Sequence, residues 1–247
     1  MKRRLTRAEA ETFACQAATP NDGALVFCPV PGCGRPPQAR AGRGLSLIHC
    51  RYHVQFRNRH GSLWKGTYSA ADLRPYRRAA TRYLGPRHGN MWIAAALVAL
   101  QSLLDRAGPN ERMADVARMK PEDKARQAFA RMRREAVPPL RLLVNYLAVS
   151  MAVAEDPIGP GGEPDEYRLT QIGKAALRTA SGSHAVYGDG AGYHRYPRSS
   201  GLALRRIGAA IDKACEHVAS EHLSAILASK REWYGARDGS NVSGLGR

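Results

Sequence analysis

Acidic residues are scarce in this chain. Its 247 residues include 21 Asp and Glu against 38 Lys and Arg, so the formal net charge is +17 and the pI is near 10.2. The scarcity is greatest in residues 1–90, which hold 4 acidic and 16 basic residues, whereas residues 91–247 hold 17 and 22. Such an excess of positive charge predicts a polyanionic partner, with nucleic acid favoured over a membrane surface.

Long hydrophobic runs are also missing. The longest run, residues 92–104, is 13 residues long and is interrupted by Gln101 and Ser102. It is too short to span a bilayer and predicts a buried helix instead. The N-terminus is basic and lacks the apolar core of a signal peptide. We therefore expect no membrane partner and no export.

Cysteine and aromatic residues are few. The five cysteines are unevenly spaced and do not resemble a disulfide framework, so we expect a reducing cytoplasm. Aromatic residues make up 7% of the chain. Proteins that bind single strands usually stack bases on exposed aromatic rings. Duplex DNA is therefore favoured over RNA or single-stranded DNA as the polyanion.

Three of the cysteines nevertheless gather in one short stretch. The spacing is Cys28-x4-Cys33-x16-Cys50-x2-His53. Two ligand pairs separated by a loop are typical of a tetrahedral structural zinc site, in which each pair sits on a tight turn. Gly32 and Gly34 flank Cys33 and allow such a turn. With four protein ligands no position is left for a catalytic water, so the pattern predicts one structural zinc ion.

Three alternatives to this ligand set stay open. His49 or His60 could replace His53 as the fourth ligand, and the thiols could be ordinary buried cysteines. The stretch contains too little apolar sequence to bury them readily. Cys15 and Cys215 are expected to be core residues, because free cysteine is commonly buried.

The same stretch resembles the small zinc fingers of phage and mobile-element proteins, which often occur beside HNH homing endonuclease modules. The resemblance covers residues 28–61 and departs from the usual pattern in the insertion "SLIH" and in Val54, where an aromatic is common. It implies zinc, nucleic acid, and a bacterial, nucleoid-associated setting. The residues that carry it, besides Cys28 and Cys33, are Gly44, Leu45, Cys50, His53, Arg57, His60 and Gly61.

An HNH nuclease would need a general-base His, a structuring Asn and a metal-binding His on a ββα unit. The candidates are His49 or His60, Asn58 or Asn90, and His88. No strand-rich segment surrounds them, so enzymatic activity is not expected.

Basic residues follow the finger closely and predict the nucleic-acid contact. On a helix, Arg74, Arg77, Arg78 and Arg82 would share one face. Guanidinium groups suit phosphates and guanine edges. A second basic group, Arg195, Arg198, Arg205 and Arg206, lies before and within the first turns of the helix expected at 201–231. The N-terminus of that helix could bind a phosphate. The full predicted set is Arg51, Arg57, Arg59, Lys65, Arg74, Arg77, Arg78, Arg82, Arg87, Arg195, Arg198, Arg205 and Arg206. A solvated basic surface without a ligand is the alternative.

The sequence predicts a mainly α fold: a small zinc-stapled basic module followed by a multi-helix domain. The expected division is an N-terminal helical segment at 1–22, the zinc module at 23–66, an α-helical domain at 67–234 and a flexible tail at 235–247. Helices are expected at 5–18, 50–59, 69–84, 91–107, 121–135, 139–154, 165–180 and 201–231. Residues 182–200 are expected to form a loop.

These features together predict a zinc-containing protein of a phage or mobile element that binds duplex DNA. Two other functions stay open, an HNH-like nuclease and an adaptor within a larger nucleoprotein complex. In the last case the helical domain would bind a second copy or another protein.

Overall fold

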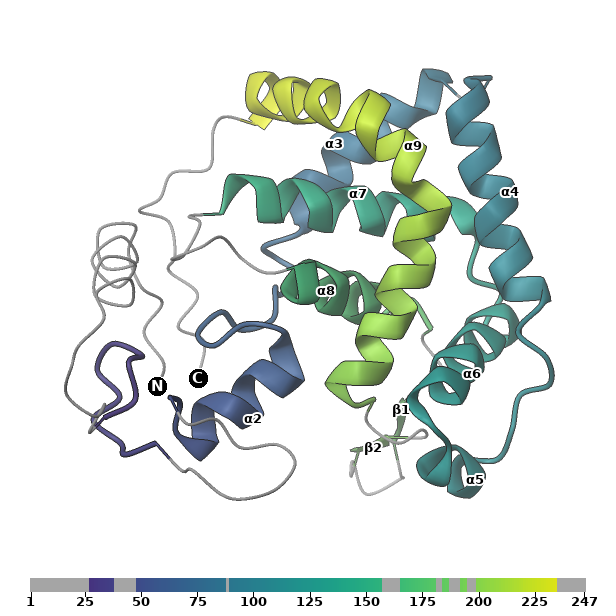
Figure 1. The fold of residues 1–247 in the computed structure, drawn as a ribbon. Coiled ribbons are helices and arrows are strands. Elements are labelled where there is room, and N and C mark those ends of the chain that lie inside the picture. The colour runs from purple at the N-terminus through teal and green to yellow at the C-terminus, as the bar shows by residue number, and fades with distance from the viewer. Residues whose placement is uncertain are drawn as a thin grey trace. The chain divides into compact units, whose positions relative to one another are not determined.

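The computed structural model describes residues 27–37, 48–87, 89–156, 165–180, 184–186, 192–194 and 199–234, and the fold is mainly α, as predicted (Figure 1). The expected helix at 5–18 and the tail at 235–247 lie outside these residues. The helices are α2 (Arg51–His60), α3 (Arg74–Leu84), η1 (Gly85–Arg87), α4 (Met91–Asp105), α5 (Met113–Arg118), α6 (Pro121–Arg134), α7 (Pro139–Glu155), α8 (Asp165–Leu177) and α9 (Gly201–Tyr234).

The chain divides into two compact units. The first contains the described residues up to Thr67, together with those between Glu155 and Tyr167. The second contains the described residues from Tyr68 to Ala154 and from Arg168 through α9. The first unit carries the cysteine cluster and α2, whereas the second carries α3 and the main hydrophobic core. The sequence did not predict that Glu155, Asp156 and Asp165–Tyr167 would join the first unit.

The core of the second unit is built around α7. Ten residues of this helix between Leu142 and Ala152 are buried, among them Leu143, Leu147 and Met151. A helix that is apolar on nearly all sides belongs at the centre of a bundle. The long helix α9 packs against α3, α4 and α6, and α4 also packs against α6 (Figure 1).

Two glycines allow α8 and α9 to approach closely. A Cβ at Gly173 of α8 would collide with the carbonyl of Leu204, and a Cβ at Gly208 of α9 would collide with the carbonyl of Leu169. The backbones therefore touch where two larger residues would separate them. The apolar residues of α9 near this contact are buried, as Leu204, Ile207 and Ile211 show.

The helix expected at 69–84 starts later than predicted, because of Pro75. The helix starts at Arg74, with Pro75 in its first turn, where a missing N–H costs nothing. Ahead of it, Ser69 and Asp72 form reciprocal hydrogen bonds: Ser69 N–H donates to Asp72 Oδ2 (2.8 Å) and Asp72 N–H donates to Ser69 Oγ (3.1 Å).

The sequence did not predict η1, α5 or the two short strands. The short helix α5 lies between the expected helices, and the loop prediction for 182–200 was wrong in part. There β1 (His184–Val186) and β2 (Gly192–His194) pair antiparallel, with Ala185 opposite Tyr193. Three-residue strands give too short an alternation to be recognised in a sequence. Within the described residues, no helix has the length and apolar character needed to cross a membrane.

Candidate metal centre and arginine cleft

The first ligand pair lies on a tight turn, as the glycines predicted. Cys28 N–H donates to the Arg35 carbonyl (2.7 Å), and Cys33 N–H donates to the Val30 carbonyl (3.0 Å). Gly32 and Gly34 have φ values of +70° and +56°. These left-handed conformations are readily available to glycine, and they turn the backbone so that both thiols face the same point.

The second ligand pair lies at the start of α2. Cys50 occupies the N-cap position with an extended φ of −69° and ψ of 157°, and the Val54 N–H donates to its carbonyl (3.1 Å). His53 follows in the first turn. Residues three apart on a helix lie on the same face, so the Cys50 thiol and the His53 ring point the same way.

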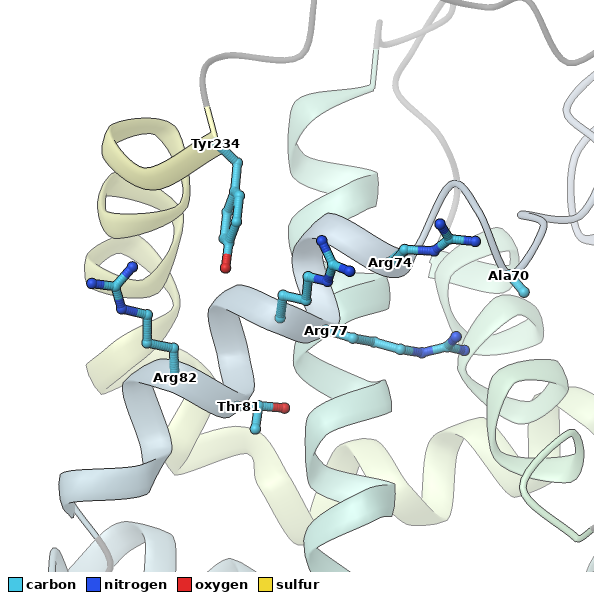
Figure 2. Close-up of a pocket in the computed structure, with 7 residues that line it drawn as sticks. Ala70, Arg74, Arg77, Thr81, Arg82 and Tyr234 are labelled. Carbon is cyan, nitrogen blue, oxygen red and sulfur yellow. The ribbon is translucent and has the colours of Figure 1, made fainter.

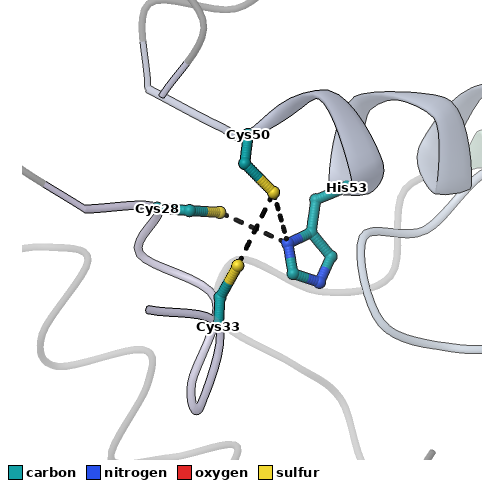
Figure 3. A group of neighbouring side chains, drawn as sticks. All are labelled: Cys28, Cys33, Cys50 and His53. Carbon is teal, nitrogen blue, oxygen red and sulfur yellow. Dashed lines mark hydrogen bonds between the residues drawn. The ribbon is translucent and has the colours of Figure 1, made fainter. Parts of the chain in front are cut away.

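All four predicted ligands come together (Figure 3). Each of Cys28, Cys33, Cys50 and His53 offers one atom, and these four atoms lie within 4.8 Å of one another. Cys28 Sγ is 3.3 Å and Cys50 Sγ is 3.4 Å from His53 Nδ1. Cys33 Sγ is 3.5 Å from Cys50 Sγ. Around a tetrahedral ion with bonds of about 2.0–2.3 Å, ligand atoms lie roughly 3.5–3.8 Å apart. The residues therefore have the donor types and spacing to hold a metal ion.

The thiols of this cluster differ in acidity. Burial, with smaller contributions from the neighbouring thiols, raises the pKa of Cys33 to about 11. Burial also opposes ionisation of Cys50, but hydrogen bonds from the His53 backbone N–H and from the other two thiols leave its pKa below the usual value. Metals bind the thiolate form. Cys50 is consequently deprotonated more readily than Cys33 in the absence of a metal.

A small set of apolar residues surrounds the cluster. Cys28, Val30 and Cys50 are buried, and Leu63 and Trp64 pack against them. This is too little apolar area to stabilise a fold of its own, which is the usual condition under which a small module depends on a metal. The alternative of ordinary buried thiols would require a larger core here.

The two substitute ligands are not part of the cluster. Among the described residues, the group able to hold a metal ion contains His53 but neither His49 nor His60. His60 Nδ1 lies 3.1 Å from Thr67 Oγ1, and its ring lies 4.4 Å from that of Phe56. Burial lowers the pKa of His49, and the nearby positive charge of Arg57 lowers it further.

The basic residues of the first unit have unequal freedom to contact a ligand. Arg51, Arg57 and Arg59 are exposed on α2, although Arg57 Nε lies 3.5 Å from Glu166 Oε2. Lys65 Nζ lies 3.9 Å from Asp156 Oδ2, and these side chains are only 18% and 9% exposed. Lys65 therefore presents little of its charge to a partner, whereas the α2 arginines are exposed.

In the second unit, four predicted arginines line one cleft of about 530 Å³, here called the α3 arginine cleft (Figure 2). The arginines occupy successive turns of α3. The close-up shows the Tyr234 ring extending from the end of α9 with its hydroxyl towards α3. The lining residues are Ala70, Arg74, Arg77, Arg78, Thr81, Arg82 and Tyr234.

Two of the cleft arginines are held by neighbours. Arg77 Nε donates to Asn145 Oδ1 (2.7 Å), and the Arg82 guanidinium lies 4.1 Å from the centre of the Trp233 ring. Burial lowers the pKa of Arg77, and the positive charges of Arg178 and Arg141 lower it further. The cleft is therefore bordered by additional positive charge.

Of the remaining predicted residues, Arg205 is half-buried on α9. The guanidinium of Arg87 lies on the Tyr83 ring (3.9 Å) and donates to the Tyr83 carbonyl (2.9 Å). Arg206 pairs with Glu122 (3.1 Å) on the surface. Ser200 caps α9, its Oγ accepting from Ala203 N–H (3.2 Å). Arg195 and Arg198 lie outside the described residues.

Sequence reasoning missed the aromatic side of the cleft. Trp233 and Tyr234 lie roughly 150 positions beyond α3 in the chain, so no local pattern relates them to its arginines. Arg141 and Arg178 were missed for the same reason. A comparison of the chain with protein-family models, with curated proteins and with solved structures finds no match.

Proposed function

We propose that this chain is a zinc-containing protein that binds duplex DNA and belongs to a bacterial phage or mobile element. The observation that carries the proposal is the gathering of Arg74, Arg77, Arg78 and Arg82 on one cleft. Clustered guanidinium groups on a chain of net charge +17 are what a polyanion would bind. The finger would supply a second contact through Arg51, Arg57 and Arg59.

Zinc is the metal that the cluster suits best. Three thiols and one imidazole form the donor set. Thiolate ligands favour zinc over magnesium, calcium or manganese, and a closed Cys3His site is a common structural zinc site. The ion would stabilise the turn at Cys28–Arg35 against the start of α2. In this proposal it organises the finger and takes no part in a reaction.

The nuclease alternative gains no support from the described residues. Asn58 and His60 lie on α2, and Asn90 Oδ1 caps α4 by accepting from Trp92 N–H (3.0 Å) and Ile93 N–H (3.2 Å). His88 lies outside the described residues. A ββα unit would place these side chains beside strands, whereas here they belong to helices and their caps.

Fluorescence anisotropy with a labelled duplex tests the proposal. We expect binding that weakens as salt rises, with single-stranded DNA and RNA of equal length competing less well than duplex. The same mixtures, incubated with Mg²⁺ and plasmid DNA, should show no cleavage. Absence of duplex binding at low salt would contradict the proposal, and magnesium-dependent cleavage would favour the nuclease.

An adaptor is the second candidate, and one surface favours it. On α4, Met91 and Val98 are 66% and 70% exposed, although the helix is strongly apolar. A partner protein or a second copy could cover such residues. Pull-down after nuclease treatment separates this function from DNA binding, because a protein partner would survive the loss of nucleic acid.

A further inference from the structure

The α3 arginine cleft has the chemistry of a site for several linked phosphates. Its polar lining consists of hydrogen-bond donors: four guanidinium groups and the hydroxyls of Thr81 and Tyr234. None of the described lining residues carries a carboxylate. Guanidinium groups cannot accept hydrogen bonds, so a ligand that fills the cleft must supply acceptors and negative charge.

The length of the arginine row indicates more than one phosphate. Arg74 and Arg82 are eight residues apart on α3, a distance of about 12 Å along the helix axis. A volume of about 530 Å³ falls in the range of small-molecule clefts rather than that of a single-ion site.

The arginines are also partly preorganised. Asn145 holds the Nε of Arg77, which leaves its two terminal nitrogens to point elsewhere, and Trp233 supports the guanidinium of Arg82. Arg74 and Arg78 are exposed, and no ion pair within the described part of the chain occupies them. Immobilised donors lose less conformational freedom on binding, so affinity per contact is higher.

We propose that the α3 arginine cleft binds a run of at least two linked phosphates, with the Tyr234 hydroxyl donating to one of them. Two sources share this chemistry: consecutive phosphodiesters of a nucleic-acid backbone and the phosphate chain of a free nucleotide. The proposal rests on the proposed function for the identity of its natural ligand. The first test of the proposal does not depend on that function, because it uses an inorganic probe.

Calorimetric titration of the full chain with inorganic tripolyphosphate is that first test. We expect one binding event per chain, weakened about tenfold or more by the double substitution Arg74→Gln and Arg78→Gln, since two charge-assisted hydrogen bonds are lost. Arg112→Gln with Arg118→Gln is the matched control. It removes the same charge from exposed positions in and before α5, and should change the affinity less than threefold.

The tyrosine gives a second readout. Tyr234→Phe removes only the hydroxyl and should weaken tripolyphosphate binding a few-fold. Unchanged affinity in this variant would show that the Tyr234 hydroxyl does not bind a phosphate. Equal weakening by the cleft pair and the control pair would overturn the proposal, because general charge would then explain the binding. No measurable binding by the folded wild-type chain would overturn it as well.

Competition experiments distinguish a nucleic-acid backbone from a free nucleotide as the source of the phosphates. Displacement of tripolyphosphate by duplex DNA assigns the cleft to the nucleic-acid backbone, whereas tighter binding of a nucleoside triphosphate than of tripolyphosphate assigns it to a free nucleotide. If neither displaces the probe, the cleft holds only an adventitious anion and the proposal fails. DNA binding that persists when tripolyphosphate does not bind leaves the proposed function standing and places its contact elsewhere.

Discussion

The guanidinium of Arg82 lies 4.1 Å from the centre of the Trp233 indole, and this contact joins α3 to the last turn of α9. Arginine over tryptophan is a favourable cation–π pair and keeps the guanidinium extended. The end of α9 therefore helps to define the α3 arginine cleft, which also places Tyr234 on its wall.

Removing three cleft arginines should change how DNA binding depends on salt. Each neutralised phosphate contributes roughly 0.9 to the slope of log K against log salt. Replacing Arg74, Arg78 and Arg82 together with Gln should reduce that slope by about two to three units. Anisotropy titrations of duplex DNA between about 50 and 200 mM salt measure it, with far-UV circular dichroism to check that the helices persist.

The control for this variant removes the same charge elsewhere. Arg112, Arg118 and Arg126 are exposed and lie outside the cleft. Their joint replacement with Gln should leave the slope close to that of the wild type. A cleft variant with unchanged affinity and slope would move the contact surface away from α3, towards the region of Arg205 and Arg206.

A single methyl group at Gly208 should destabilise the second unit. A Cβ there would collide with the backbone carbonyl of Leu169, which cannot rotate away as a side chain can. Gly208→Ala should therefore lower the free energy of unfolding by about 1–3 kcal/mol, measured by urea denaturation. Gly85→Ala is the control, because nothing lies within 4 Å of its added Cβ. Equal stability of the two variants would show that α8 and α9 can separate at little cost.

The sequence indicated the metal cluster and the arginine face well, because both depend on local spacing. Cys50 and His53 share one turn of α2, and the four α3 arginines follow the helical period, so short-range geometry determines each group. The other side of the cleft depends on long-range packing. Trp233 meets Arg82, and Asn145 meets Arg77, only because α7 and α9 pack beside α3. The pairing of Lys65 with Asp156 is equally non-local. The sequence therefore did not distinguish Lys65 from the neighbouring basic residues as a nucleic-acid contact.

Cys215 should resist thiol reagents in the folded chain. Burial raises its pKa above the usual value, and the nearby charge of Asp212 raises it further. Its side chain is almost fully enclosed. Because the folded state holds this proton more tightly than the unfolded state, the resulting stabilisation is complete below the unfolded thiol pKa of about 8.5 and is lost at higher pH.

Iodoacetamide labelling near pH 8 with peptide mass spectrometry measures this protection. Cys215 should stay unmodified in the native chain and react fully in guanidinium chloride. In metal-free protein Cys50 should react before Cys33, since the pKa of Cys50 is lowered and that of Cys33 is raised. Rapid native labelling of Cys215 would mean that α9 opens far more often than its packing suggests.

Loss of one ligand should release the metal and unfold the finger alone. We expect about one zinc ion per chain in protein purified without chelator, and little or none in Cys33→Ser, because the binding energy of a structural ion is also folding energy of its module. His49→Gln is the matched control, since His49 stands next to Cys50 in sequence but outside the cluster. It should keep its zinc.

Hydrogen exchange shows which part of the chain unfolds when the metal is lost. In Cys33→Ser, or after chelation, amides of α2 and of the turn at Cys28–Arg35 should lose protection, while those of α7 keep it. Sequence discrimination on DNA should fall together with affinity, because Arg51, Arg57 and Arg59 would lose the helix that orients them. Zinc-free wild-type protein with a protected α2 would contradict the structural role of the ion. Equal zinc loss in His49→Gln would show that His49, and not His53, is the fourth ligand.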